Sequence, residues 1–395
     1  MNTDERKIEE LLTRGVEKIY PSKEALRSVL QSGRKLRLYQ GFDPTGKHLH
    51  LGHLVGLRKL SAWQSMGHEV IFLIGDGTGQ AGDPSGKTTA REKFHTQKEL
   101  RTNAENYVAQ SGKIVSFRGK GAVKVLYNGD WHEEAKSKIL DIAQNFSLSQ
   151  LAERDLFETR TKKGQTVNLR EFLYPLFQAY DSVKLEVDLE LGGTDQTFNM
   201  LAGRSLLKSM KNKEKFVMTT PLLSDHSGRK IGKTEGNVIA LDDAPDDLYG
   251  KIMALPDEVI VQCFECLTNV PLEKVINIRE AIARGENPMP YKKELAEEIV
   301  RELNTDVVAK KATQEFSSAF QNREIPDSIP EIRGEGTLME TLVKAGVVSS
   351  KAEFRRLLAS GAIENLGGEV VTDVGVPAIK GARFRIGKHR FVKIK

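Results

Sequence analysis

The first half of this 395-residue chain predicts an α/β fold with a parallel sheet, because short apolar runs alternate with glycine-rich turns and helical patterns. Residues 36–39 have the character of a strand and lead into a turn at 41–45. A helical pattern follows over 50–66, and the apolar run at 70–74 has the length of a buried strand. That run ends in a loop over 75–86. In such a sheet, ligands bind at the carboxyl ends of the strands.

The other elements of this region follow in chain order. Two helical stretches precede the first strand, and residues 122–127 form a further candidate strand. Residues 131–178 are mostly helical with a polar break at 161–165, which predicts a helical insertion between two halves of the sheet. The alternating pattern over 183–191 predicts a strand. A glycine-rich loop at 192–196 then leads into another helix.

The second half of the chain predicts three further segments. The pattern over 244–320 is helical and is punctuated by prolines, and prolines and glycines mark a linker before a final small region. The predicted boundaries are 1–240 for the sheet domain, with its insertion at about 130–180, 241–322 for a helical domain, 323–336 for the linker and 337–395 for a small basic domain.

Positive charge is concentrated at the end of the chain. The net charge is +5, and residues 337–395 contain eleven Lys or Arg against five Asp or Glu. A basic segment of this kind is typical of a part that binds a polyanion. The N-terminus is charged and no apolar run reaches membrane-spanning length, so we expect a cytoplasmic protein without a membrane segment.

The chain has two cysteines, Cys263 and Cys266. Their spacing invites a metal or redox interpretation, but no second Cys or His pair lies near them in the sequence. We therefore expect two buried or half-buried thiols and no structural metal.

Two short polar signatures carry most of the functional information. The first, His-Leu-Gly-His at 50–53, places two imidazoles at a predicted helix N-terminus, where backbone N–H groups attract anions. The second, Lys-Ile-Gly-Lys-Thr at 230–234, places two ammonium groups and a hydroxyl on a loop. Each alone is also compatible with a solvated surface. Together they can surround a triphosphate and stabilise the charge that develops during nucleotidyl transfer.

The loop at 75–86 allows competing interpretations. Residues 77–82 match the dinucleotide pattern G-x-G-x-x-G, but Asp83 and Pro84 stand where the phosphate-binding helix should begin. A P-loop requires a glycine at position 81, which is Ala81. We favour a turn whose glycines allow close approach of a ligand and whose Asp83 faces a cation.

One helix presents a polar face. Tyr174, Gln178 and Asp181 are spaced so that they share one side of a helix, where burial is costly unless they bind something. The alternative interpretation is a helix that packs Leu173, Phe177 and Tyr180 into the core. The two interpretations are compatible if the polar and the apolar residues occupy opposite faces of the helix.

These motifs resemble those of the class I aminoacyl-tRNA synthetases and, within that class, the bacterial tyrosyl-tRNA synthetases. The resemblance covers almost the whole chain. The second signature, usually Lys-Met-Ser-Lys-Ser, differs at its centre but keeps both lysines and a final hydroxyl. The resemblance implies a Rossmann-like catalytic domain with a helical insertion, an all-helical domain that binds tRNA and a small α+β RNA-binding domain. It implies activation of L-tyrosine with ATP and transfer to tRNA(Tyr).

The resemblance also implies roles for individual residues. Tyr174, Gln178 and Asp83 bind the substrate ammonium, Gln196 its carboxylate, and Tyr39 with Asp181 its phenolic hydroxyl. Residues implied in ATP binding are Gly41, Gly52, Gly193, Asp195 and Lys233. Those implied in charge stabilisation during catalysis are Thr45, His50, His53, Lys230, Lys233 and Thr234. A carboxylate needs no deprotonation to attack, so no general base is assigned, and Mg²⁺ enters with ATP.

The basic end resembles the RNA-binding module of a small-subunit ribosomal protein. The candidate RNA contacts are Lys351, Arg355, Arg356, Arg383, Arg385, Lys388 and Arg390. By the same resemblance, the helical insertion forms a homodimer contact. Two alternatives stay open at this point: a tryptophanyl enzyme of the same class, and a synthetase-like RNA-binding protein without adenylation activity.

Overall fold

The computed structural model spans residues 1–395. It describes the chain apart from residues 86–93, 153–159, 161, 226, 227, 229, 232, 235, 236, 322–328, 367, 368, 388 and 389. At residues 150, 152, 233, 234, 237 and 319–321 only the backbone is described. The described chain divides into two compact units, Met1–Asp243 with Leu255–Leu295 and Ala244–Ala254 with Ala296–Lys395.

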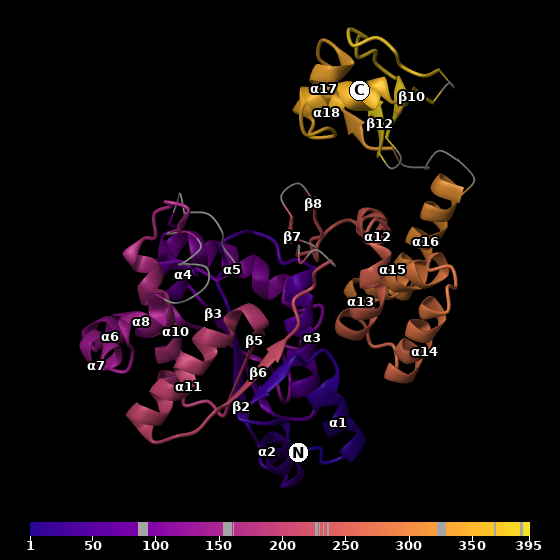
Figure 1. Ribbon diagram of the computed structural model, residues 1–395. Helices are drawn as coiled ribbons and strands as arrows, with labels where there is room; N and C mark the ends of the chain where they lie inside the picture. The colour runs from indigo at the N-terminus through magenta and orange to yellow at the C-terminus, as the bar shows by residue number, and fades with distance from the viewer. Residues whose placement is uncertain are drawn as a thin grey trace. The chain divides into compact units, whose positions relative to one another are not determined.

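Within the described residues of the first unit, six strands form a central sheet (Figure 1). Their spatial order is β1 (Lys18–Tyr20), β6 (Phe216–Thr220), β5 (Leu189–Gly193), β2 (Arg37–Phe42), β3 (Glu69–Ile74) and β4 (Lys124–Tyr127). Neighbouring strands are parallel except for β1 and β6. Residues 70–74 of β3 are all buried, as expected for a parallel strand that is covered on both faces.

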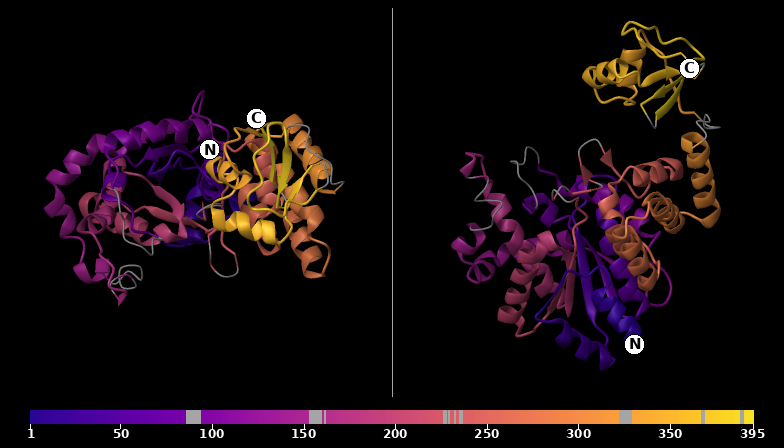
Figure 2. Two further views of the ribbon diagram at one scale, coloured as in Figure 1. Left: turned by 90° about the horizontal axis from the view of Figure 1, so that it is seen from above. Right: turned by 45° about the vertical axis from the view of Figure 1, so that its right-hand side comes forward.

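Helices cover both faces of this sheet. The connection between β2 and β3 is α3 (Leu51–Ser65) on one side, while α10 (Leu169–Leu185) and α11 (Thr197–Lys211) pack together on the other (Figures 1 and 2). Further helices of this unit are α1 (Glu5–Thr13), α2 (Lys23–Gln31), α4 (Thr78–Ala81), α5 (Gln97–Ser111), α6 (His132–Ser137), α7 (Ile139–Ala143), α8 (Leu148–Ala152), α13 (Ile260–Leu267) and α14 (Leu272–Ala283). Short 3₁₀ turns occur at η1 (Asn128–Trp131), η2 (Thr194–Gln196) and η3 (Asp257–Val259).

The predicted α/β fold class is confirmed, and the strands predicted at 36–39, 70–74 and 122–127 correspond to β2, β3 and β4. Two details differ. The prediction contains neither β1 nor β6, and the strand expected from residue 183 begins only at Leu189. Residues 183–185 instead continue α10. Val183 and Leu185 are buried in this helix, and their apolar character is equally compatible with a strand, so the sequence pattern did not distinguish the two.

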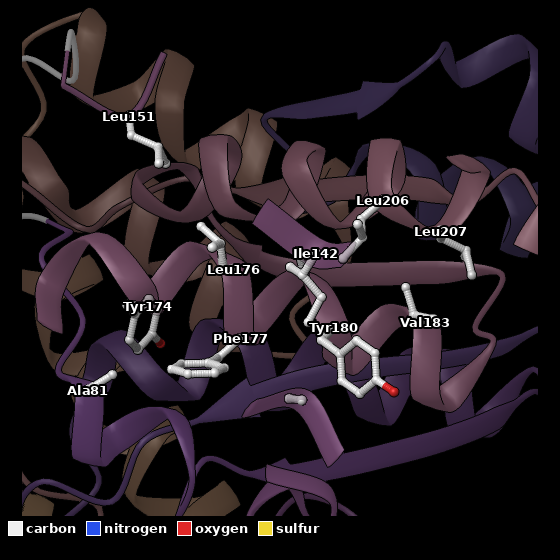
Figure 3. Close-up of a cluster of buried hydrophobic side chains, with 12 residues drawn as sticks. Ala81, Ile142, Leu151, Tyr174, Leu176, Phe177, Tyr180, Val183, Leu206 and Leu207 are labelled. Carbon is white, nitrogen blue, oxygen red and sulfur yellow. The ribbon is translucent and has the colours of Figure 1, made fainter. Parts of the chain in front are cut away.

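The helical insertion has its own apolar core, formed by α6, α7, α8 and α10 together with α11. Phe177 and Tyr180 of α10 are buried in it, and Tyr174 lies beside Ala81 of α4 (Figure 3). Tyr180 carries its hydroxyl on the opposite side of the cluster from Tyr174 (Figure 3). Tyr174, although it lies on the predicted polar face of α10, is thus also a member of the apolar cluster.

The second unit contains helical segments and a small mixed domain. Helix α12 (Pro245–Met253) packs against α16 (Asp306–Gln321), with the rings of Tyr249 and Phe316 5.1 Å apart. Helix α15 (Met289–Leu303) spans the division between the units. Among the described residues, none of the helices combines the length and apolar character that crossing a bilayer requires.

The C-terminal domain has a sheet in the order β10 (Ile363–Asn365), β11 (Arg383–Ile386), β12 (Arg390–Ile394) and β9 (Glu331–Ile332). Helices α17 (Leu338–Lys344) and α18 (Lys351–Ala359) pack on it around a core drawn only from residues of this domain. Strand β9 lies within the stretch expected to be linker, because its parallel pairing with β12 recruits it into the sheet.

Candidate active site

Loops at the carboxyl ends of three neighbouring parallel strands contain the residues that the sequence singles out. Residues 43–50 follow β2, residues 75–85 follow β3, and η2 follows β5. The polar face of α10 lies next to them, since α10 contacts α4. This is the position at which open parallel sheets bind their ligands.

His50 and His53 cap the N-terminus of α3 with their rings. His50 Nδ1 accepts the backbone N–H of Gly52, and His53 Nδ1 accepts the backbone N–H of His50, both at 3.1 Å. Because a backbone N–H only donates, the hydrogen of each neutral ring is on Nε2. A Cβ at Gly52 would lie 3.0 Å from the His50 ring, so a glycine is needed there. Two imidazole N–H groups thus occur at a helix end that favours anions.

The segment after the second signature lies directly beside the first. Backbone hydrogen bonds of 3.1 and 2.9 Å join residues 49–51 to residues 239–241 in antiparallel pairing. Residues 239–241 follow the hairpin of β7 (Lys233–Thr234) and β8 (Asn237–Val238). Tertiary structure therefore brings the segment that follows the second signature against the first signature, although the two are remote in sequence.

One end of this pairing, where residue 49 faces residue 241, is fastened by side chains. His48 Nδ1 lies 2.8 Å from Asp242 Oδ2, and Lys113 Nζ donates to the carbonyl of Leu241 at 2.8 Å. Gln110 bonds to the backbone of Leu49 and Lys47. These contacts hold residues 239–242, which follow the β7–β8 hairpin, against the start of α3.

The first lysine of the second signature contacts the loop after β5. Lys230 Nζ lies 2.9 Å from Asp195 Oδ2, so a residue implied in ATP binding and a residue implied in charge stabilisation are adjacent. Gly232 lies outside the described residues, and for Lys233 and Thr234 only the backbone is described.

Asp83 and Gln196 are hydrogen-bonded to each other. Gln196 Nε2 donates to Asp83 Oδ2 at 2.8 Å, and Gln196 Oε1 accepts from Asn199 at 2.9 Å. Burial raises the pKa of Asp83 above its usual value, against the lowering effect of the bonds from Ser85 and Gln196. An α-amino acid carries its ammonium and carboxylate on one carbon, so groups that bind the two must be neighbours, as these are.

Asp43 is a site residue to which the sequence analysis assigns no role. It accepts from Thr78 Oγ1 at 2.8 Å, and it lies so close to Gly75 that a Cβ there would be 1.8 Å from Asp43 Oδ1. Burial, followed by the charges of Asp43 and Asp83, raises the pKa of Tyr174 well above its usual value. Tyr174 therefore sits among carboxylates, an environment that suits a cationic ligand. The only sequence signal for Asp43 is its place in the turn at 41–45.

Asp181 and Tyr39 lie deeper in the same region. Asp181 accepts from Trp131 Nε1 at 2.8 Å and from Asn128 Nδ2 at 3.0 Å. Burial outweighs these bonds and raises the pKa of Asp181 to about 8. The hydroxyl of Tyr39 lies 3.1 Å from Ser182 Oγ. Burial, followed by the charges of Glu190 and Asp181, raises the pKa of Tyr39 well above its usual value.

The remaining candidate residues line the exposed side of the site. Thr45 and Gly41 are exposed, and a Cβ built at Gly41 meets no atom within 4 Å. At Gly193 a Cβ would lie 2.7 Å from Asp195 Oδ1, so this glycine permits the tight turn into η2. In the described part of the chain, no group of three or more His, Cys, Asp or Glu could hold a metal ion. Cys263 and Cys266 are both buried on α13, as predicted.

The candidate RNA contacts divide into two groups. Lys351, Arg355 and Arg356 of α18 and Arg383 of β11 are exposed. Arg385 and Arg390 are engaged within the domain, in ion pairs with Glu364 and Glu353 respectively. Lys388 lies outside the described residues.

Comparisons with known proteins agree with this geometry. The family described as tRNA synthetases class I (W and Y) matches residues 31–321. A tyrosine–tRNA ligase of Dehalococcoides mccartyi is 37% identical over 400 residues and covers 100% of both chains. Tyrosine–tRNA ligase 2 of Vibrio vulnificus is 39% identical over 387 residues, 97% of both chains.

The fold has solved relatives as well. A truncated mitochondrial tyrosyl-tRNA synthetase of Aspergillus nidulans superposes with a TM-score of 0.65 at 23% identity, over 80% of this chain and 93% of that one. Full-length sequence similarity and the family match lead to one conclusion. The chain belongs to the class I tRNA synthetases for tryptophan and tyrosine, and its relatives within that family are tyrosine–tRNA ligases.

Proposed function

We propose that this protein is a tyrosine–tRNA ligase that activates L-tyrosine with ATP to tyrosyl-adenylate and transfers it to the 3′ end of tRNA(Tyr). The observation that carries the proposal is the backbone pairing of residues 49–51 with 239–241, which joins the histidine signature to the segment that follows the lysine signature. The relatives named tyrosine–tRNA ligase over the full chain length support it.

The polar groups of the site are arranged to match the three functional groups of tyrosine. In this proposal Asp83, Tyr174 and Gln178 bind the ammonium, and Asp43 adds negative charge beside them. Gln196, bonded to Asp83, meets the carboxylate. Tyr39 and Asp181 hydrogen-bond to the phenolic hydroxyl, and phenylalanine would leave both without that partner.

The chemistry is an in-line attack of the tyrosine carboxylate on the α-phosphate of ATP, with pyrophosphate leaving. The attacking carboxylate is already ionised, so catalysis consists of positioning and charge stabilisation. His50 and His53 supply N–H donors, while Thr45, Lys230, Lys233 and Thr234 stabilise the charge on the phosphates. Gly41, Gly52, Gly193 and Asp195 hold the nucleotide. Mg²⁺ belongs to the ATP substrate. Because tRNA is charged where ribosomes work, we also place the protein in the cytoplasm.

Replacing Tyr39 by Phe tests the substrate assignment. The change removes one hydrogen-bonding hydroxyl, so the ratio of kcat/KM for tyrosine to that for phenylalanine should fall about tenfold in amino-acid-dependent pyrophosphate exchange. Tyr180→Phe is the matched control, because its hydroxyl bonds to Glu134 at 2.8 Å, away from the site. Exchange that depends on tryptophan and not on tyrosine would contradict the proposal.

We further propose that the protein is a homodimer formed through the helical insertion. Leu140, Leu148 and Leu169 are large apolar residues there with 82%, 74% and 74% of their surface exposed. A cleft of about 340 Å³ lined by Ile139, Leu173 and Phe177 among others opens in the same region. Apolar surface of this kind marks a contact with another protein.

Replacing Leu140 and Leu148 by Asp should therefore convert the dimer to monomers without unfolding it. The reason is that two carboxylates would be buried unpaired in the interface. Sedimentation velocity measures the change. Val307→Asp on α16, also at a highly exposed position, is the control and should leave the mass unaltered. A wild-type protein that sediments as a monomer would refute the dimer.

A further inference from the structure

A buried ion pair lies next to the proposed tyrosine site. Lys215 and Glu190 are each 1% exposed, and their charged groups are in contact. Glu190 is in β5, and Lys215 immediately precedes the neighbouring strand β6. Burying two charges costs desolvation free energy, and the attraction between the charges often does no more than offset this cost. Two well-packed apolar side chains would therefore stabilise the fold equally well. The further contacts of this pair suggest a different purpose.

The carboxylate of Glu190 orients Gln178. Gln178 Nε2 donates to Glu190 Oε1 at 3.0 Å. Because an ionised carboxylate only accepts, the amide of Gln178 must turn its NH₂ group toward Glu190 and its oxygen away. That oxygen, Gln178 Oε1, is buried and has no hydrogen-bond partner among the described residues. A buried acceptor without a partner is costly, and an ammonium group, which only donates, supplies what is missing.

The ammonium of Lys215 reaches Tyr39 through one hydroxyl. Lys215 Nζ donates to Ser182 Oγ at 2.6 Å, and Ser182 Oγ lies 3.1 Å from the hydroxyl of Tyr39. Ser182 also contacts Glu190 Oε2 at 3.3 Å. Gly203 of α11 makes this possible, since a Cβ there would lie 2.8 Å from both Lys215 Nζ and Ser182 Oγ.

We propose that Glu190 and Lys215 are positioning residues for the amino acid: Glu190 aims the Gln178 carbonyl at the substrate ammonium, and Lys215, through Ser182, holds the Tyr39 hydroxyl at the substrate phenol. One buried ion pair thus orients the residues that bind tyrosine at both ends of its pocket. The inference rests on the proposed function, because it takes tyrosine as the substrate.

The ammonium end is tested with the double variant Glu190→Gln/Lys215→Met, which is neutral and close in volume to the original pair. Without the carboxylate, the Gln178 amide is no longer forced into one orientation. The KM for tyrosine in pyrophosphate exchange should rise at least about tenfold, while the KM for ATP stays unchanged. Inhibition by 3-(4-hydroxyphenyl)propionate, which lacks the amino group, should weaken less, so the preference for tyrosine over this compound should fall.

The hydroxyl end is tested separately with Ser182→Ala. Tyr39 then loses its partner, and the ratio of kcat/KM for tyrosine to that for phenylalanine should fall about tenfold. Discrimination between tyrosine and the compound without an amino group should not change. The double variant, which removes Lys215 as well as Glu190, therefore affects both ends of the substrate, whereas Ser182→Ala affects only the hydroxyl end. A general loss of packing would not produce this difference.

Lys59→Met is the matched control. Lys59 is also a buried lysine of the first unit, but its Nζ donates to the carbonyl of Leu11 at 2.7 Å. This variant should change neither the ratio that measures the preference for tyrosine over the compound without an amino group nor the ratio of kcat/KM for tyrosine to that for phenylalanine. The inference is overturned if the double variant and Ser182→Ala lower the melting temperature but keep both ratios at the wild-type values. If the double variant does not fold, Glu190→Gln alone is judged by the same criteria. A wild-type protein without tyrosine-dependent exchange would instead refute the proposed function.

Discussion

Replacing Lys233 by Ala is expected to slow formation of tyrosyl-adenylate by about 10²–10³-fold, which is typical for removal of one preorganised group that stabilises transition-state charge. The affinity for tyrosine should not change, since the second signature faces the phosphates in the proposed mechanism. Single-turnover measurement of adenylate formation gives the rate, and the tyrosine dependence of that rate gives the affinity.

Lys208→Ala provides the comparison for this variant. Lys208 is an exposed lysine of α11 that pairs only with Glu214 among the ion pairs of the described residues, so its loss should leave the rate unaltered. An unchanged rate of pyrophosphate exchange in Lys233→Ala would remove this lysine from the catalytic proposal. The Lys230 position could then be tested alone, because its ion pair with Asp195 already places it in the site.

Deletion of residues 330–395 is expected to abolish efficient charging of tRNA while adenylate formation continues at the wild-type rate. The exposed basic residues of α18 and β11 are the proposed contacts with RNA phosphates. Each charge-assisted hydrogen bond contributes about 1.5 kcal/mol or more, so losing two already lowers kcat/KM for tRNA about 10²-fold. Aminoacylation with labelled tyrosine and pyrophosphate exchange measure the two steps separately.

The deletion begins at residue 330 because strand β9 belongs to the sheet of the C-terminal domain. Strand β9 pairs with β12, and Lys395 donates its backbone N–H to Ile332, so a cut at residue 337 would leave an orphaned strand behind. The core of the domain contains only its own residues, which makes removal of the whole domain a clean change. Equal loss of adenylate formation and of charging would refute the division of labour between the domains.

The sequence predicts a helix or strand well when the length and periodicity of its apolar pattern are compatible with only one type of secondary structure. The apolar run at 70–74 becomes β3, and the residues after His50 form α3, because length and periodicity leave few alternatives. Short or ambiguous stretches fare worse. Strand β1 has three residues, and its pairing partner β6 is remote in the chain. Residues 183–185 satisfy a strand and a helix pattern equally, and packing against the insertion core decides for the helix.

The sequence by itself determined the family, the two signatures and the polar face of α10, because these depend on residue type and near-neighbour spacing. Only the tertiary structure decided which polar groups meet. The partner of Tyr39 is Ser182, Glu190 and Lys215 form a buried pair, and Asp43 joins the site. Such contacts join residues from different strands and helices, and their distances depend on how the whole chain packs, so no local pattern encodes them.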